Sequence, residues 1–451
     1  MTVLFAKTAL LPDGWARDVE VEIVAGRIIR VEPGLPAAGA MGCLLPAPVN
    51  LHSHAFQRAM AGMTERRSAG QDSFWTWRSL MYRFLDRLMP EDVEAIAAFV
   101  QMEMAEAGYA AVVEFHYLHH APGGVAYANP AEMSGRIAAA AAETGLGLTL
   151  LPVLYSQGGC DGRPLGPGQA RFGNDFKGFS RLWECAEHAM NALPPDKRIG
   201  VAPHSLRAVT RDQLALAAGM APDAPLHMHL AEQVAEVTEV QAAYGARPVA
   251  WLLDNHAVDA RWCLIHCTQM EPAETIRLAA SGAVAGLCPI TEANLGDGIF
   301  DGVRFAGAAG RWGVGSDSNV RIALAEELRL LEYSQRLRDR GRALLATDER
   351  STGRVLFESA VAGGAQAAGR ASGAIRVGDW ADLLVLDMGA VDLEGRQGDA
   401  ILDAWIFAGD DRMVADVWSA GRHVVQSGQH IARDRITNRY RAVMARLKDA
   451  L

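Results

Sequence analysis

The chain has 451 residues, half of them hydrophobic and 21% charged, which is enough for a large folded domain with a smaller one attached. Its formal net charge is −10 and it has no apolar run long enough to cross a bilayer, so we expect neither nucleic-acid nor membrane partners. Six cysteines without CxxC spacing, and a first segment without a secretory signal pattern, favour the reducing environment of the cytoplasm.

Both ends of the chain are rich in β-strand signals. Residues 18–32 predict a hairpin, because two β-branched runs flank Ala25 and Gly26 at a tight turn. Similar short strands are expected at 381–387 and within 414–425. We therefore predict a small composite β domain from residues 1–46 and 373–451, the second part also carrying a terminal helix.

Residues 47–372 alternate apolar runs with helical periodicity, for example in the helical segments 90–108 and 270–281. Near-continuous apolar runs are typical of strands buried on both faces of a parallel sheet. Eight such units predict a (β/α)8 barrel of the TIM type, with its active site at the C-terminal ends of the strands. The candidate strands are 47–51, 111–115, 148–154, 199–203, 226–230, 262–265, 283–287 and 312–315.

Two points of this organisation stay open. The alternative fold is an open doubly wound sheet, although no GxGxxG or GxxxxGK[ST] fingerprint follows the first strand. Residues 361–374, rich in Gly and Ala, fit either a linker or a helix of small residues.

Polar residues follow four of the predicted strands. His52 and His54 follow the first, and alternate residues of an extended chain face the same side. His229 lies near the end of the fifth strand and Asp317 follows the eighth, so a barrel would gather all four side chains at its mouth. Imidazole and carboxylate ligands suit borderline divalent ions. We predict one divalent metal ion per chain, with zinc as the expected ion; independent structural histidines are the alternative.

Three residues are candidates for proton transfer. Glu232 lies three residues beyond His229, where it can reach a substrate without binding metal, and His266 ends the adjacent strand. We expect Glu232, His266 and Asp317 to be catalytic, with Asp317 also a metal ligand. His227, on the same strand as His229, is expected to have a structural or supporting role.

Several segments resemble the amidohydrolase superfamily over nearly the whole chain. They are VNLHSHAFQR (49–58), HMHLAE (227–232), LIHC (264–267), GVGSDS (313–318) and the C-terminal GAIRVGDWADLLVLD (373–387). The resemblance implies the barrel, the small β domain and metal-dependent hydrolysis. Binuclear members of that superfamily carry a bridging lysine at the end of strand four, where this chain has Pro203 and His204. That departure implies one metal ion, as in the deaminase branch.

Further segments resemble the members of this branch that hydrolyse N-formimidoyl-L-glutamate to N-formyl-L-glutamate and ammonia in histidine breakdown. They are AFQRAMAG (55–62), FWTWRSLMY (74–82), EFHYLHH (114–120) and PHSLRAV (203–209). Such a substrate has a cationic amidine and two carboxylates, which arginine forks hold well. The candidate substrate-binding residues are Gln57, Arg78, Tyr117, His204 and Arg207.

The segment around Arg78 is also rich in aromatic residues, and Phe74, Trp75 and Trp77 are expected to form a lid. For Arg78 and Gln57 the alternative is a position on the surface or at a subunit interface. The three remaining histidines of this region are expected in a solvated loop: His116, His119 and His120.

Other functions of the same fold remain open. The nearest is deamination of guanine or a related heterocycle, followed by hydrolysis of a carboxamide or N-acyl bond and by an inactive metal-binding paralogue. A cytidine-type zinc deaminase is excluded, because the HxE and PCxxC motifs are missing. The expected partner is a small anionic substrate, and the sequence leaves open whether the chain is a monomer or a homodimer.

Overall fold

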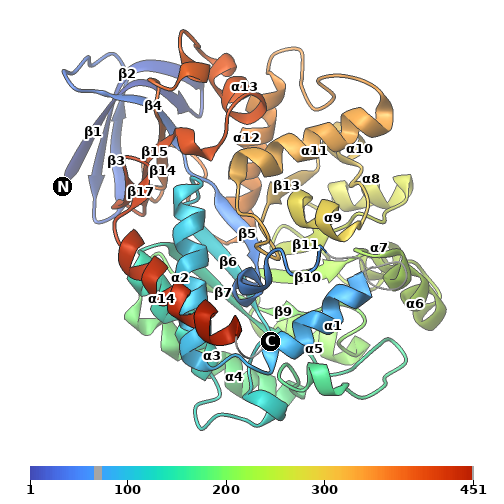
Figure 1. Cartoon of the computed structure of the whole chain (residues 1–451). Coiled ribbons are helices and arrows are strands. Elements are labelled where there is room, and N and C mark those ends of the chain that lie inside the picture. Colours follow the sequence, from blue (N-terminus) through green and yellow to red (C-terminus); the bar gives the residue numbers. More distant parts are fainter. Residues whose placement is uncertain (66–73, 449–451) are drawn as a thin grey trace.

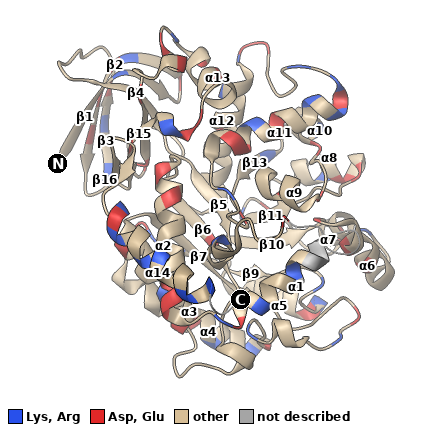
Figure 2. Cartoon of the chain, viewed as in Figure 1, with Lys and Arg blue, Asp and Glu red and all other residues tan. Residues whose placement is uncertain are grey.

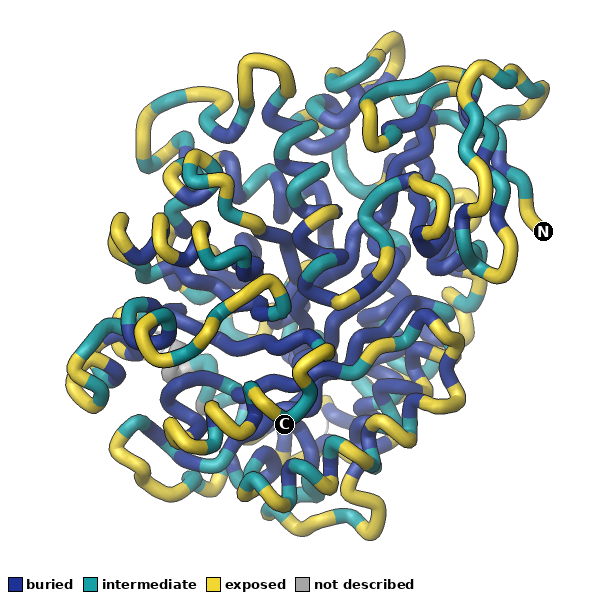
Figure 3. Tube along the Cα trace, turned by 180° about the vertical axis from the view of Figure 1, so that it is seen from behind, coloured by how far each residue is buried: buried dark blue, intermediate teal, exposed yellow. Residues whose placement is uncertain are grey.

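The computed structural model describes residues 1–65 and 74–448, and it consists of a barrel and a sheet that both ends of the chain build together (Figure 1). Buried backbone fills the centre of both parts, and exposed residues lie on the peripheral helices and loops (Figure 3). Among the described residues, no helix is both long and apolar enough to cross a membrane.

The sheet of the two chain ends has eight strands in the order β17-β16-β15-β14-β4-β1-β2-β3. Its strands are β1 (Thr2–Leu11), β2 (Gly14–Val24), β3 (Arg27–Glu32), β4 (Met41–Pro46), β14 (Leu383–Leu386), β15 (Val414–Ser419), β16 (Arg422–Gln426) and β17 (Gln429–His430). The N-terminal and C-terminal halves meet where β4 pairs antiparallel with β14. This confirms the composite β domain.

The predicted hairpin is formed by β2 and β3. Its turn residues Ala25 and Gly26 have φ angles of 49° and 80°, the left-handed region that tight hairpin turns require. The prediction missed β1 and β4, which pair in parallel with each other although a whole hairpin separates them in the sequence.

Parallel strands form the wall of the barrel in two hydrogen-bonded sheets, β5-β6-β7-β8, with β9 also on β7, and β10-β11-β12-β13. They are β5 (Val49–Ser53), β6 (Ala111–His116), β7 (Gly147–Leu154), β8 (Arg198–Ile199), β9 (Ala202–Pro203), β10 (Leu226–Leu230), β11 (Trp262–His266), β12 (Val284–Leu287) and β13 (Arg311–Val314). Parallel bridges between Val201 and Leu226 and between Ser53 and Asp317 join the two sheets at both seams. The barrel is therefore closed, which confirms the predicted (β/α)8 architecture over the open-sheet alternative.

The fourth barrel strand differs from its prediction. One continuous strand at 199–203 was expected, but β8 and β9 are separate pieces that both pair with β7. Between them Val201 turns to the next strand, donating its backbone N–H to the carbonyl of Pro225 at 2.9 Å. The chain changes partner here, because this position lies at the seam between the two sheets.

Helices surround the barrel, and most Lys, Arg, Asp and Glu residues lie on these helices and the loops (Figure 2). The helices are α1 (Phe74–Leu85), α2 (Pro90–Glu106), α3 (Glu132–Thr144), α4 (Phe176–Ala189), α5 (Arg211–Met220), α6 (Val234–Tyr244), α7 (Pro248–Asn255), α8 (Pro272–Ala280), α9 (Pro289–Leu295), α10 (Gly302–Gly307), α11 (Leu324–Asp339), α12 (Thr352–Ala367), α13 (Asp399–Phe407) and α14 (Arg433–Lys448). The helical periodicity at 90–108 and 270–281 corresponds to α2 and α8. Both helices begin with proline, whose fixed φ suits the first helical turn.

The Gly- and Ala-rich stretch is not a linker, since residues 361–367 belong to α12. This helix lies directly on β13, and its glycines make the close approach possible. A Cβ atom on Gly363 would lie 1.9 Å from the carbonyl oxygen of Trp312, and one on Gly364 would lie 2.8 Å from that of Val49. Small residues here bring the helix backbone against the strand that leads to Asp317.

We expect Gly363→Ala to destabilise the protein, because the added methyl group meets backbone atoms that cannot move aside. Overpacking of this kind lowers the free energy of unfolding by about 1–3 kcal/mol. Gly135→Ala on α3 is the matched control. A Cβ atom on Gly135 would have no neighbour within 4 Å, so this substitution should raise the free energy of unfolding by about 0.5–1 kcal/mol. Thermal and chemical unfolding of both variants test this, and a Gly363→Ala protein as stable as the original would contradict the packing argument.

Candidate active site

Three histidines and one aspartate converge at the C-terminal ends of the barrel strands. His52 lies within β5 and His54 directly after it, His229 lies in β10, and Asp317 follows β13. The His52 Nε2 atom lies 3.1 Å from His229 Nε2 and 3.4 Å from Asp317 Oδ1, which is 3.2 Å from His54 Nε2. All four ligand-type atoms lie within 4.8 Å of one another, and all four residues are buried.

Backbone carbonyls fix two of the imidazole rings. His54 Nδ1 lies 2.9 Å from the carbonyl oxygen of Phe115, and His229 Nδ1 lies 3.1 Å from that of His204. A nitrogen facing a carbonyl must carry the proton, so Nε2 of both rings presents a lone pair to the centre. This is how proteins orient histidines that bind metal.

The spacing and electrostatics of this cluster fit a divalent metal ion. Ligands about 2.0–2.1 Å from a tetrahedral ion lie about 3.3–3.4 Å from each other, close to the separations observed here. Burial lowers the pKa of His52 to about 3 and that of His229 well below its usual value, so both rings are neutral. Burial opposes ionisation of Asp317, but the hydrogen bond from His52 and the neighbouring imidazoles lower its pKa overall. Neutral imidazoles and an ionised carboxylate are the forms that bind metal.

A buried network holds the two segments that carry these residues. Asp317 donates its backbone N–H to the carbonyl of His52, and His54 donates to that of Asp317, both at 2.9 Å. The Asn319 amide donates to the carbonyls of His54 and Asp317, each at 3.1 Å, and its Oδ1 accepts from Ser316. No local sequence pattern predicts a role for Asn319 or Ser316, because their function depends on this contact between distant segments.

His266 lies beside the cluster among three carboxylates. Its Nδ1 is 3.3 Å from Glu292 Oε1, and its Nε2 is 3.9 Å from both Glu232 Oε1 and Asp317 Oδ2. Burial lowers the pKa of His266, but Glu232, Glu292 and Asp317 outweigh it and raise the value to about 10. Burial raises the pKa of Glu232, against the opposing charges of His266 and Arg207. The protonated ring of His266 thus lies between two glutamates, Glu232 and Glu292, and the group of His52, His54, His229 and Asp317, which is called the metal-type cluster below.

Several backbones at this mouth adopt left-handed conformations that non-glycine residues rarely accept. The φ angles are 52° at Ala231, 70° at His266, 51° at Cys267, 45° at Asp317 and 54° at Asn319. Each such residue lowers the free energy of unfolding by on the order of 1–3 kcal/mol, and backbone strain of this kind is concentrated at functional sites. Here it turns the side chains of His266 and Asp317 toward one centre.

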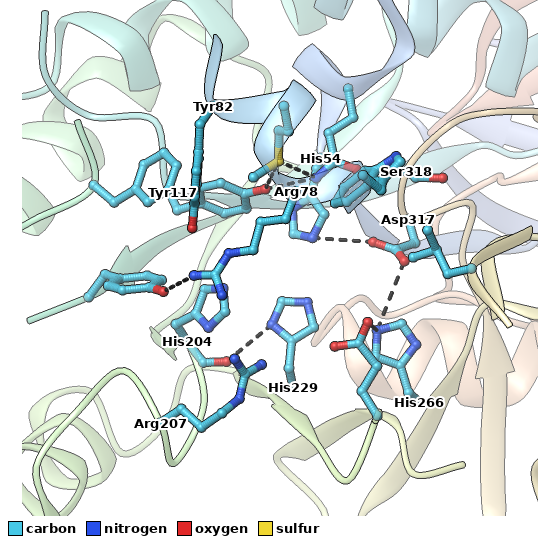
Figure 4. Close-up of a pocket in the computed structure, with 17 residues that line it drawn as sticks. His54, Arg78, Tyr82, Tyr117, His204, Arg207, His229, His266, Asp317 and Ser318 are labelled. Carbon is cyan, nitrogen blue, oxygen red and sulfur yellow. Dashed lines mark hydrogen bonds and ion pairs between the residues drawn. The ribbon is translucent and has the colours of Figure 1, made fainter. Parts of the chain in front are cut away.

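A pocket opens over the cluster, and its two ends differ in charge (Figure 4). Asp317 and His266 lie at one end, whereas Arg78 and Arg207 reach in at the other, with His229 between them. The lining residues are His54, Gln57, Trp77, Arg78, Met81, Tyr82, Tyr117, Tyr155, Phe172, His204, Arg207, His229, Glu232, His266, Leu295, Asp317 and Ser318.

The structure brings every predicted substrate-binding residue into this pocket. Gln57 is 4% exposed, so it is neither a surface nor an interface residue of this chain, and its amide donates to the Tyr117 hydroxyl at 2.7 Å. Arg207 is 8% exposed, and its Nε has no hydrogen-bond partner among the described residues. A buried guanidinium with a vacant donor is suited to binding an anion.

Two other expectations have different outcomes. His116 and His119 were expected in a solvated loop, which is wrong: they are 2% and 1% exposed, and His119 Nε2 lies 2.9 Å from the carbonyl of Val153. His116 is the last residue of the buried strand β6, and His119 lies in the segment after it, which packs inward; of the three, only His120 is partly exposed. His227 Nε2 donates to the carbonyl of Ala367, 2.8 Å away, and His227 does not line the pocket.

Part of the expected lid lies outside the described residues, since the side chains of Phe74 and Trp75 are not described. Trp77 and Arg78, on the same helix, line the pocket. The pocket is also lined by Met81, Tyr155 and Phe172, which were not predicted from the sequence. These are ordinary core-type residues in sequence, and nothing in their spacing distinguishes them.

Comparisons with known proteins agree with this geometry. Residues 43–424 match the model of the amidohydrolase family, and residues 1–41 match that of the formimidoylglutamate deiminase HutF N-terminal domain. The chain is 51% identical to formimidoylglutamate deiminase of Pseudomonas aeruginosa, over 100% of both chains. It is 26% identical to a 5-methylthioadenosine/S-adenosylhomocysteine deaminase of Natronomonas pharaonis, over 93% of this chain and 89% of that one.

Solved structures show the same fold. An amidohydrolase from Brucella melitensis superposes with a TM-score of 0.96 at 48% identity, covering 99% of this chain and 100% of that one. An adenosine deaminase from Xanthomonas campestris, solved with bound zinc, superposes with a TM-score of 0.82 at 22% identity, covering 99% and 98%. The second likeness concerns the fold alone.

Proposed function

Because the chain belongs to the amidohydrolase family, we propose that it is a metal-dependent deiminase that converts N-formimidoyl-L-glutamate and water to N-formyl-L-glutamate and ammonia. The pathway served is histidine degradation, and the site of action is the cytoplasm. The substrate is a small molecule with two carboxylates and one amidine.

The division of charge within one pocket supports this substrate most directly. The amidine end requires a water-activating centre, which the cluster of His52, His54, His229 and Asp317 can provide. The acid end requires cationic donors, which Arg78 and Arg207 supply on the opposite side (Figure 4). A purine is held by amide contacts and stacking surfaces, and it has no carboxylates that would need a pair of guanidinium groups. Guanine is therefore the weaker alternative.

His52, His54, His229 and Asp317 would hold one divalent ion, for which we propose zinc. Such an ion lowers the pKa of a bound water toward neutrality. No lysine follows the fourth strand, where the chain has Pro203 and His204, so the ligand that bridges two ions in binuclear relatives is missing.

The neighbouring residues would move the protons. His266 is held by Glu292 through Nδ1, so its Nε2 faces the space between Glu232 and Asp317. Asp317 would accept the proton that the attacking water loses, whereas His266, whose raised pKa of about 10 keeps it protonated, would polarise the electrophile. Glu232, which lines the same pocket, would deliver a proton to the nitrogen that leaves as ammonia.

Gln57, Tyr117 and His204 would complete the substrate site. The Gln57 amide already donates to the Tyr117 hydroxyl, so these two side chains act as a pair. His204 lies between the metal-type cluster and the acid end, since its ring centroid is 4.8 Å from that of His229.

We expect Arg207→Met to lower kcat/KM for N-formimidoyl-L-glutamate by one to a few orders of magnitude. The substrate carboxylate would lose a charge-assisted hydrogen bond, worth about 1.5–3 kcal/mol, as it leaves water. Metal content should not change, because Arg207 is not among the ligand-type residues. Ammonia release and metal analysis measure the two effects.

Arg211→Met is the control for this prediction, since Arg211 is an exposed arginine outside the pocket. N-formimidoylglycine, which lacks the side-chain carboxylate, should be a poor substrate of the unmodified enzyme. Efficient deamination of guanine, adenine or cytosine, together with an Arg207→Met variant equal to the original, would overturn the proposed substrate.

A further inference from the structure

Tyr155 directly follows β7 at the mouth of the barrel, where it lines the pocket and contacts both Arg78 and Gln169. Its side chain is buried, with 4% of the residue exposed. The ring packs edge-on against His204, with the centroids 4.5 Å apart, and tilted against Phe172, with the centroids 5.7 Å apart. Packing on both sides therefore holds the hydroxyl in one place at the cationic end of the pocket.

The Tyr155 hydroxyl receives two hydrogen bonds. Arg78 Nη2 lies 3.0 Å from the oxygen and Gln169 Nε2 lies 2.8 Å from it. A guanidinium group can only donate. The orientation of the Gln169 amide is also fixed, because its Oε1 accepts the backbone N–H of Gly166 at 2.9 Å, so that its NH2 group must face Tyr155.

These two donors determine where the hydroxyl hydrogen points. A phenol oxygen has one hydrogen to donate and accepts through its lone pairs. With Arg78 and Gln169 both donating to this oxygen, its own hydrogen is directed away from both of them. In a pocket whose arginines attract anions, an ordered O–H of this kind is suited to a carboxylate oxygen.

We propose that Tyr155 donates this hydrogen to the side-chain carboxylate of the substrate, which Tyr155 and Arg78 hold together; this rests on the proposed function. The choice of carboxylate follows from position. His204 packs against His229 of the metal-type cluster, and Tyr155 packs on His204, one ring farther from the cluster. The side-chain carboxylate is also the acid group farther from the reacting carbon.

Gln169 is then a positioning residue that acts through Tyr155. It belongs to a loop that packs closely on α1, since a Cβ atom on Gly168 would lie 2.4 Å from the Tyr82 ring. The loop and the helix thus reach Tyr155 from two sides, one through Gln169 and the other through Arg78. Loss of the Gln169 donor should leave Tyr155 in the pocket but free its hydroxyl to rotate.

The test compares Tyr155→Phe with the original enzyme on two substrates. N-formimidoyl-L-glutamate has the side-chain carboxylate, and N-formimidoyl-L-norvaline carries a methyl group in its place. We expect Tyr155→Phe to lower kcat/KM for the first by about 10- to 100-fold, mainly through KM, and to leave the second unchanged. Gln169→Leu should show the same selectivity with a smaller rise in KM and an unchanged kcat.

Two measurements keep the test independent of folding and of general effects. Binding of glutarate, which does not react, should weaken in Tyr155→Phe when measured by calorimetry, with metal content unchanged. Tyr109→Phe removes another buried tyrosine hydroxyl outside the pocket and should behave as the original on both substrates.

The outcomes separate this inference from the proposed function. An equal loss on both substrates, or no loss on either, with glutarate binding unchanged, would overturn the role of Tyr155. An original enzyme that does not turn over N-formimidoyl-L-glutamate would overturn the proposed function instead. A loss restricted to the dicarboxylate, accompanied by weaker glutarate binding, supports the assignment.

Discussion

His229→Ala is expected to abolish both metal binding and turnover. His229 Nε2 lies 3.1 Å from His52 Nε2, and its other nitrogen is fixed by the carbonyl of His204, so its ring is held in place as one of the four ligand-type groups. A catalytic metal site with three or four protein ligands loses affinity steeply when one is removed. Metal analysis of the purified variant and an ammonia-release assay measure the two losses together.

The unmodified protein should contain about one divalent ion per chain, and exhaustive chelation should inactivate it. Zinc added back should restore activity to the chelated protein but not to His229→Ala. His188→Ala, an exposed histidine on α4, is the control and should keep both metal and activity. A protein that stays fully active after chelation would disprove the metal-dependent mechanism.

Glu232→Gln is expected to keep its metal while turnover falls by roughly 10²-fold or more. The Glu232 side chain lines the pocket and faces His266 at 3.9 Å, but it is not among the four residues of the metal-type cluster. Gln preserves the size of the side chain and removes its ability to transfer a proton. The loss should therefore appear in kcat, as measured by steady-state ammonia release.

Asp317→Asn provides the contrast, because Asp317 contributes both a ligand-type oxygen and a proton acceptor. That variant should lose metal and turnover together. If Glu232→Gln lost its metal while remaining folded, Glu232 would be a ligand and not a proton shuttle. If its turnover stayed unchanged, the leaving nitrogen would have to receive its proton from another group.

The sequence predicted the parts of this molecule that depend on local periodicity. Alternation along an extended chain put His52 and His54 on one face, and the repeat of apolar runs predicted the closed barrel that positions them. The composite sheet was also predicted, but the pairing of β1 with β4 was not. Such a pairing joins segments separated by a hairpin, and no local pattern marks it.

The unpredicted features depend on contacts between distant segments. Asn319 supports the cluster because β5 and the loop after β13 meet at the barrel seam. His119 tolerates its burial because its Nε2 finds a carbonyl of the neighbouring strand β7 within hydrogen-bonding distance. Tyr155 is indistinguishable from a core residue until Arg78 and Gln169 are seen at its hydroxyl. Each of these side chains has its role through partners that the sequence places far away.

The left-handed backbones at the barrel mouth have a consequence for laboratory evolution of this enzyme. The protein is less stable because the backbones of His266 and Asp317 are left-handed, a conformation that glycine adopts more readily. Selection for heat tolerance alone would favour glycine or asparagine at these positions, and the resulting proteins would be robust and inactive. A thermostable working catalyst must therefore gain its stability elsewhere, in the outer helices and loops, with the strand ends left unchanged.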